Sequence, residues 1–218
     1  VEKYCIGVDF GTQSGRALLV RLHDGEEVAV SVMEYEHGVM TQELPSGIQL
    51  PANFALQHPG DYFKVLKYIV SDVLQKAGVQ PEQVLGLGIA VTSSTILPVM
   101  EDGTPLCFLP DYQDDPHSWI KLWKHHGAQR EAVELDEFLQ ENAPEISIQF
   151  GASSAERLLP KVLEVKRRSP QVYHQAYSFM EVADWIVWRL TGKQQRSAPI
   201  AGYKSMWRKE TGYLSSDL

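Results

Sequence analysis

The segment of this sequence best suited to chemistry is the octapeptide DFGTQSGR, which begins at Asp9 and follows a short apolar run. Recognition of a phosphate group requires backbone N–H groups that the ligand can approach closely, hydroxyl donors and a cation. The octapeptide offers all of these, in Gly11, Gly15, Thr12, Ser14 and Arg16. Its composition therefore predicts a loop that binds phosphate.

Asp9 adds a carboxylate at the end of the apolar run. A hydrated Mg²⁺ ion keeps several waters and uses few protein carboxylates, so Asp9 can hold Mg²⁺ through water. The spacing is neither that of a Walker A loop, since no Gly-Lys-Ser/Thr follows, nor that of the GxGxxG dinucleotide fingerprint. Asp, Gly and Thr are also common in ordinary β-hairpin turns. The residues alone leave a phosphate loop and a plain turn as alternatives.

Hydrophobic periodicity indicates the elements that must hold this loop in place. A β-meander, with a tight hairpin at Asp24-Gly25, is followed by an amphipathic helix that begins at Pro59 and ends near Gly78. Two more strands follow, and the first of them is an apolar run that predicts a buried strand. The predicted strands span residues 4–8, 16–22, 27–35, 84–91 and 95–100.

The second half of the chain has helical spacing. The predicted helices span residues 116–139, 153–165 and 172–190, and Thr191-Gly192 is a typical helix stop. His125 and His126 would point about 100° apart on the first of these helices, which argues against a shared zinc ion. The whole pattern predicts an α/β domain with a helical extension at about residues 116–192.

Composition narrows the class of protein. The chain has 218 residues, of which 44% are hydrophobic and 22% charged, as is typical of a globular protein. Its net charge of −8 argues against nucleic acid or an anionic membrane as the main partner. Its apolar runs are shorter than the ~20 residues of a membrane span. Two distant cysteines, Cys5 and Cys107, favour a reducing compartment, so we expect a cytoplasmic protein.

Particular motifs carry a resemblance to a known family. Gly-Val-Asp-Phe-Gly-Thr followed by Ser-Gly-Arg-Ala resembles the first phosphate loop of the FGGY carbohydrate kinases, which belong to the sugar-kinase, Hsp70 and actin superfamily. From Tyr4 to Trp207 the sequence is most similar to the ribulokinase group of that family. The further matching motifs are Gln57-His58-Pro59, Thr92-Ser93-Ser94-Thr95, Leu122-Trp123-Lys124, Gln129-Arg130-Glu131, Ala183-Asp184-Trp185 and Ala201-Gly202-Tyr203-Lys204.

The resemblance implies a fold and a reaction. The fold would be an α/β, ribonuclease H-like (actin-like ATPase) lobe with a mixed sheet and flanking helices, and residues 1–218 would form the N-terminal domain of an FGGY kinase. The reaction would be phosphorylation of ribulose by ATP with Mg²⁺. Its catalytic residues would be Asp9, near Mg²⁺, and Arg16, near the transferred group. Contacts with the ATP phosphates would come from Gly11, Thr12 and Ser14.

The resemblance also implies sugar contacts at Ser93 and Lys204. Ser93 lies in a hydroxyl-rich loop after the predicted strand at 84–91, a place where α/β folds often bind ligands, although such a loop can also be a plain turn. Without the resemblance, Lys204 would be read as a surface charge. One departure is Ala90, where ribulokinases usually carry Asp. The sequence leaves open whether the loss of this carboxylate is natural drift or a change that weakens sugar binding.

Family members are roughly twice as long or more, and their second lobe supplies the general base. We therefore expect the partners of this chain to be ribulose and a C-terminal lobe, with a homo-oligomer left open, and we expect residues 1–218 alone to be inactive. Two alternatives stay open: another FGGY sugar kinase, such as one similar to xylulokinase, and a non-catalytic module that binds sugar or nucleotide.

Overall fold

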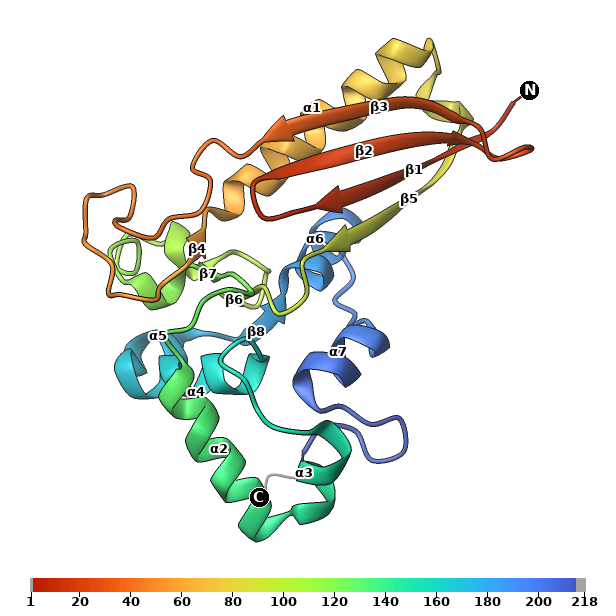
Figure 1. Cartoon of the computed structure of the whole chain (residues 1–218). Helices are drawn as coiled ribbons and strands as arrows, with labels where there is room; N and C mark the ends of the chain where they lie inside the picture. The colour runs from red at the N-terminus through yellow and green to blue at the C-terminus, as the bar shows by residue number, and fades with distance from the viewer. Residues whose placement is uncertain (1, 215–218) are drawn as a thin grey trace. The chain divides into compact units, whose positions relative to one another are not determined.

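The computed structural model describes residues 2–214, which form two compact units (Figure 1). Unit 1 comprises the residues up to 39 together with 58–92, and unit 2 comprises 40–57 together with the residues from 93 onward. The chain thus leaves unit 1 after its third strand, returns for one helix and one strand, and leaves again. Each unit is described by itself.

Unit 1 is built on a four-stranded mixed sheet with the order β3-β2-β1-β5. The hairpin strands β1 and β2 are antiparallel, as are β2 and β3, whereas β5 runs parallel to β1. The turn between β2 and β3 uses Gly25 at a φ of 75°, as the Asp24-Gly25 pair predicts. The strands are β1 (Tyr4–Phe10), β2 (Ser14–Arg21), β3 (Glu27–Glu34) and β5 (Val84–Val91).

Helix α1 (Pro59–Ala77) covers one face of this sheet and packs on β3, β2 and β1 (Figure 1). His58 caps its first turn by accepting a hydrogen bond from the Gly60 N–H, and Pro59 provides the fixed φ that suits a first helical position. Gly78 ends the helix in the left-handed conformation, at a φ of 63°. Among the described residues no helix, α1 included, combines the length and apolarity needed to cross a membrane.

The prediction that the run at 84–91 is buried is wrong. The run does form β5, but Leu85 is 64% exposed and Leu87 is 39% exposed. The reason is position, because β5 lies at the edge of the sheet while α1 packs mainly over β3 and β2. An apolar run therefore indicated the strand correctly and its burial incorrectly.

Gly15 shows why one glycine of the octapeptide is needed. Its position on β2 faces α1, and a Cβ atom there would lie 2.7 Å from Cγ1 of Val65 and 3.1 Å from the Phe10 ring. We expect Gly15→Ala to lower the free energy of unfolding by roughly 1–3 kcal/mol, the usual cost of overpacking a core. Denaturant unfolding measures this loss. Gly7→Ala is the matched control, since a Cβ on Gly7 of the same sheet meets no described atom within 4 Å; equal losses for both variants would contradict the packing explanation.

Unit 2 contains a second, antiparallel sheet with the order β4-β7-β6-β8. Its strands are short: β4 (Leu56–Gln57), β7 (Ile120–Lys121), β6 (Ile96–Val99) and β8 (Ser178–Glu181). The helices of this unit are α2 (Gln129–Asn142), α3 (Pro144–Phe150), α4 (Leu158–Arg168), α5 (Pro170–Gln175), α6 (Val182–Thr191) and α7 (Ala198–Ser205). In the part of the chain that the structure describes, 3₁₀ turns occur at Pro81–Gln83, Leu106–Phe108 and Pro116–Ser118.

All three helices predicted in the second half are wrong in part. For the run 153–165, the helix α4 begins only at Leu158. The run 116–139 begins as a 3₁₀ turn and the strand β7, and only its second part belongs to α2. The run 172–190 is divided by β8, which pairs with β6 along its whole length. Strand pairing with residues far away in the sequence overrides the local helical spacing in both places. The stop at Gly192 is confirmed, at a φ of 70°. The predicted single domain over residues 1–218, whose terminal residues 1 and 215–218 lie outside the described part, stays a prediction.

Candidate functional site

The octapeptide forms the tight turn between β1 and β2. The Gly11 N–H donates to the Ser14 carbonyl across this turn at 2.9 Å, so this amide serves the shape of the loop. Tyr35, which follows β3, holds the turn from a second side: its hydroxyl donates to the Gly11 carbonyl at 3.0 Å and its N–H donates to the Gln13 carbonyl at 3.0 Å. The loop is therefore fixed by the third strand of the meander.

Tyr35 is a residue that sequence reasoning missed. Its side chain is buried, and its ring centroid lies 5.3 Å from that of Tyr62 on α1. Burial raises the pKa of Tyr35, helped by the negative charges of Asp9 and Asp61, so the hydroxyl stays a donor at physiological pH. A tyrosine at the end of a strand gives no sequence signal for this role.

Asp9 and Arg16 lie side by side at the loop end of unit 1. They are direct partners in the β1–β2 register, with 3.7 Å between Nε of Arg16 and Oδ2 of Asp9. Both side chains are more than half exposed, at 53% for Asp9 and 60% for Arg16, so their mutual attraction is weak and both remain available to a ligand. They border a hollow of about 490 Å³, whose other lining residues are Gly7, Val8, Leu18, Gly88, Ile89 and Ala90.

Ala90 is the neighbour of Asp9 on the other side. The parallel β1–β5 register pairs the two residues, which places them about 4.8 Å apart across the strands. An aspartate at position 90 would put a second carboxylate beside Asp9, whereas alanine leaves Asp9 with Arg16 as its charged cross-strand partner. A single exposed carboxylate at a strand end fits one Mg²⁺ ion that is held mainly through water.

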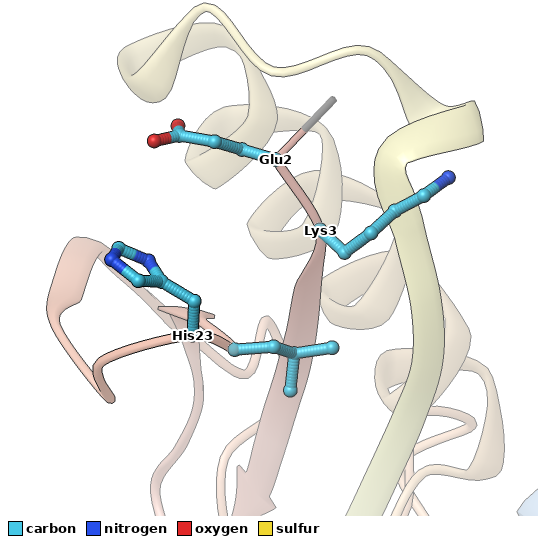
Figure 2. A pocket seen from close by; sticks show the side chains of 4 residues that line it. Glu2, Lys3 and His23 are labelled. Carbon is cyan, nitrogen blue, oxygen red and sulfur yellow. The ribbon is translucent and has the colours of Figure 1, made fainter.

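A second hollow of unit 1, of about 480 Å³, lies at the opposite end of the strands from Asp9 (Figure 2). It is lined by Glu2, Lys3, Leu22 and His23. Figure 2 shows the Glu2 carboxylate and the His23 ring on one side and the Lys3 ammonium extending to the other. Glu2 already accepts a hydrogen bond from the Tyr4 hydroxyl at 2.7 Å, and no predicted site residue lines this hollow.

His37, His58 and Asp61 bring three metal-ligating groups within 4.8 Å of one another. Their geometry does not suit one ion, because the two imidazole rings are stacked at 4.2 Å with only 10° between their planes. A ligating nitrogen points its lone pair within its own ring plane, and parallel planes do not meet at a common ion. Instead, Oδ1 of Asp61 lies 2.9 Å from Nδ1 of His37, and Nδ1 of His58 caps α1 by accepting from the Gly60 N–H. The three residues order the start of this helix.

In unit 2, Ser93 begins the turn that leads into β6. Ser93 is half-buried and the next residue, Ser94, is fully buried with a positive φ of 65°. The Ser94 carbonyl accepts a hydrogen bond from Nζ of Lys161 at 2.5 Å, and the same ammonium donates to the Leu122 carbonyl at 2.8 Å. The predicted sugar loop thus rests on a buried lysine of α4.

Lys204, the other predicted sugar contact, lies on α7. Its side chain is partly exposed, and Nζ lies 4.6 Å from the ring centroid of Tyr203, which is 69% exposed. The ammonium can leave this contact, since an exposed cation–π interaction is worth only ~0.5–1 kcal/mol. The structure therefore places Ser93 and Lys204 in the same unit, and Asp9, Arg16 and the phosphate loop together in the other.

A buried cluster of charged side chains lies next to β7. Nζ of Lys121 lies 3.0 Å from Oε2 of Glu164 and 3.1 Å from Nδ1 of His117. Nε2 of His125 lies 2.9 Å from the same Oε2 of Glu164. Burial lowers the pKa of His117 to about 3 and that of His125 to about 4, with the Lys121 charge as the second cause. Burial alone would raise the pKa of Glu164, but Lys121 and His125 outweigh it and lower this pKa. His125 thus packs inside unit 2 as a neutral partner of Glu164.

Comparison with known proteins places the chain in a family. Residues 4–207 match the FGGY family of carbohydrate kinases, N-terminal domain. The chain belongs to the FGGY family of carbohydrate kinases. This FGGY chain is 45% identical to a ribulokinase of Geobacillus thermodenitrificans over 218 residues, covering 99% of the chain and 38% of that protein. It is 46% identical to a ribulokinase of Bacillus licheniformis over 206 residues, covering 94% of the chain and 37% of that protein.

Solved structures support the fold of this FGGY chain. A xylulose kinase from Rhodospirillum rubrum matches with a TM-score of 0.77 and 18% identity, covering 99% of the chain and 40% of that protein. A ligand-bound xylulose kinase from Lactobacillus acidophilus matches with a TM-score of 0.74 and 18% identity, covering 99% of the chain and 39% of that protein. The predicted fold class, a sugar-kinase lobe with a mixed sheet and flanking helices, is confirmed. The chain spans about 38% of the length of the ribulokinases it matches.

Proposed function

We propose that this chain is the N-terminal lobe of an ATP-dependent ribulokinase that phosphorylates ribulose in arabinose catabolism. The observation that carries the proposal is similarity along the whole chain, since 45% identity extends over 99% of its residues. The exposed Asp9–Arg16 pair beside a turn rich in glycine and hydroxyl groups supports it. Because ATP and phosphorylated sugars are cytoplasmic metabolites, we place the enzyme in the cytoplasm.

Phosphoryl transfer depends mainly on positioning and on neutralising charge, and the residues of unit 1 can supply both. Thr12 and Ser14 would donate hydroxyl hydrogen bonds to the phosphates of ATP, and Gly11 gives the turn the shape that lets them approach. The Arg16 guanidinium would lie near the transferred group. Asp9 would hold Mg²⁺ through water, and this ion, when bound, neutralises charge on the phosphates.

The sugar would be bound by unit 2. Ser93 offers a hydroxyl and Lys204 an ammonium, and both are suitable partners for the hydroxyls and the single carbonyl of a ketopentose. The sugar hydroxyl that attacks the phosphate must lose a proton, and we assign no residue of this chain as its base. We propose that the remaining length of the relatives provides this base and the other wall of the site. A homo-oligomer stays a prediction.

Lys204→Met in the complete kinase should reduce kcat/KM for ribulose by roughly 10- to 150-fold, which corresponds to the ~1.5–3 kcal/mol of a hydrogen bond to a charged group. The KM for ATP should change little, because Lys204 is assigned to the sugar. Steady-state kinetics with each substrate varied measures both values. Lys209→Met, which removes an exposed lysine of the same unit, is the control. An equal loss for ribulose and ATP would refute the assignment.

A second candidate function is a non-catalytic module that binds sugar or nucleotide. Ala90 favours it, because alanine is paired with Asp9 at the position where the family resemblance implies a second carboxylate. An assay of ADP release with ribulose, and in parallel with xylulose, separates the possibilities. Ribulose-dependent release supports the ribulokinase, release only with xylulose supports another FGGY kinase, and calorimetric binding of ribulose without release supports the binding module.

A further inference from the structure

Lys161 of α4 joins two backbone segments that are far apart in the sequence. Its ammonium donates to the carbonyl of Ser94, just before β6, and to the carbonyl of Leu122, just after β7. The side chain is fully buried. Each carbonyl belongs to a residue adjacent to one that the sequence motifs single out, namely Ser93 and Trp123.

A fully buried lysine is unusual and costly unless its charge is paired. Among the described residues no carboxylate lies within ion-pair distance of Nζ of Lys161, although Glu181, Glu156 and Glu164 are near enough to influence it. The strong partners of this ammonium are therefore the two neutral carbonyls. A methionine would fill the same space without the cost of desolvating a charge, so the retained ammonium points to a role for the two bonds.

Glu181, the last residue of β8, lies at the same turn, on the side of the backbone N–H groups of the turn. Its buried carboxylate lies near the backbone N–H groups of Ser94 and Thr95, which lower its pKa against the raising effect of burial. The Val182 N–H also donates to the Thr95 carbonyl at 2.8 Å. Ser94 has a positive φ, and a non-glycine residue keeps such a conformation only where its surroundings fix it. A buried cation binds the carbonyl of this strained turn, and a buried carboxylate lies beside its amides.

We propose that Lys161 and Glu181 form a clamp that positions the Ser93–Ser94 turn and the Leu122–Trp123 peptide for binding of the sugar. The proposal rests on the proposed function, because the sugar is assigned to Ser93. Lys161 is a positioning residue: it acts on the sugar through the backbone of the two segments it joins. Burial, the main cause, lowers the pKa of Lys161 to about 7 and raises that of Glu181 to about 7, and it outweighs the attraction between the two charges, which acts on each pKa in the opposite direction.

Lys161→Met in the complete kinase tests the clamp. A small displacement of substrate-positioning groups can cost up to roughly 100-fold, so we expect the KM for ribulose to rise at least ~10-fold and the KM for ATP to change less than ~3-fold. Hydrogen exchange should become faster at residues 92–97 and 120–126 and stay unchanged elsewhere. Lys121→Met is the matched control, since it also removes a fully buried ammonium but breaks bonds to Glu164 and His117. It should lower the melting temperature and leave the KM for ribulose within ~3-fold.

Glu181→Ala and Glu181→Gln keep the test decisive if Lys161→Met does not fold. The alanine variant should reproduce the rise in the KM for ribulose, whereas glutamine, whose amide oxygen can accept from the N–H groups of the turn, should restore most of the affinity. Unchanged ribulose KM and unchanged exchange at 92–97 in Lys161→Met would overturn the clamp, as would equal losses for both substrates with faster exchange throughout. If the unsubstituted protein neither phosphorylates nor binds sugar, the proposed function fails, and the exchange pattern alone decides on the clamp.

Discussion

Asp9→Ala in the complete kinase should lower kcat by at least ~100-fold at saturating ribulose and ATP, while calorimetric binding of ribulose stays close to that of the unsubstituted enzyme. Asp9 is exposed at the end of β1 and is the carboxylate that we assign to Mg²⁺. Charge neutralisation on the phosphates matters most in the transition state, so its loss appears in kcat. The measurement is turnover as a function of the Mg²⁺ concentration.

The pairing of Asp9 with Arg16 calls for two further variants. Asp9→Asn keeps an oxygen that can accept from Arg16 but removes the negative charge, so it should lose as much activity as alanine if the charge is what binds Mg²⁺. Asp24→Ala removes another exposed carboxylate of unit 1, one that pairs with Arg21, and should leave kcat unchanged. Near-normal turnover of Asp9→Ala at saturating Mg²⁺ would rule out the metal role.

Local patterns predicted unit 1 well because its elements are defined locally. The Asp24-Gly25 turn sets the hairpin of β2 and β3, and the spacing of apolar residues after Pro59 sets α1. The adjacency of Asp9 and Arg16 follows directly from a tight β1–β2 turn, since the register pairs the residues that flank it. The same patterns failed for β7 and β8, whose two and four residues become strands only by pairing with β4 and β6.

The residues that support the candidate site were harder to predict. Lys161 and Glu164 lie on the buried face of α4 together with Val165, so charged residues occupy positions where the apolar stripe of an amphipathic helix is expected. That departure is a usable signal for buried charges. It does not identify their partners, because Ser94, Leu122 and Glu181 come from other elements. Tyr35 gave no signal of any kind.

Glu164→Leu should have the largest effect on stability, a loss of about 3–5 kcal/mol in the free energy of unfolding at pH 7. The Glu164 carboxylate is fully buried and binds both Lys121 and His125. Its removal leaves a buried ammonium without a counter-charge. Lys121→Met combined with Glu164→Leu should recover most of the loss, because an apolar pair of similar volume costs no desolvation of charge. Glu36→Gln, which breaks an exposed pair with Lys64, should shift the unfolding midpoint little.

The free energy of unfolding should fall as the pH falls, because of the buried histidines and Glu164 of this cluster. The pKa values of His117 and His125 fall to about 3 and about 4 on folding, so between pH ~6.5 and ~4 the unfolded chain binds protons that the folded chain does not, and stability falls as the pH falls. The lowered pKa of Glu164 adds stability that is present above its unfolded value of ~4.5 and is lost below it. Urea unfolding at pH 7 and pH 4 should therefore show a steep acid loss for the unsubstituted protein and a smaller difference from Glu164→Leu at the lower pH. A difference that is equal at both pH values would mean that leucine acts through packing, because His117 and His125 are present in both proteins and only the Glu164 carboxyl is absent from the variant.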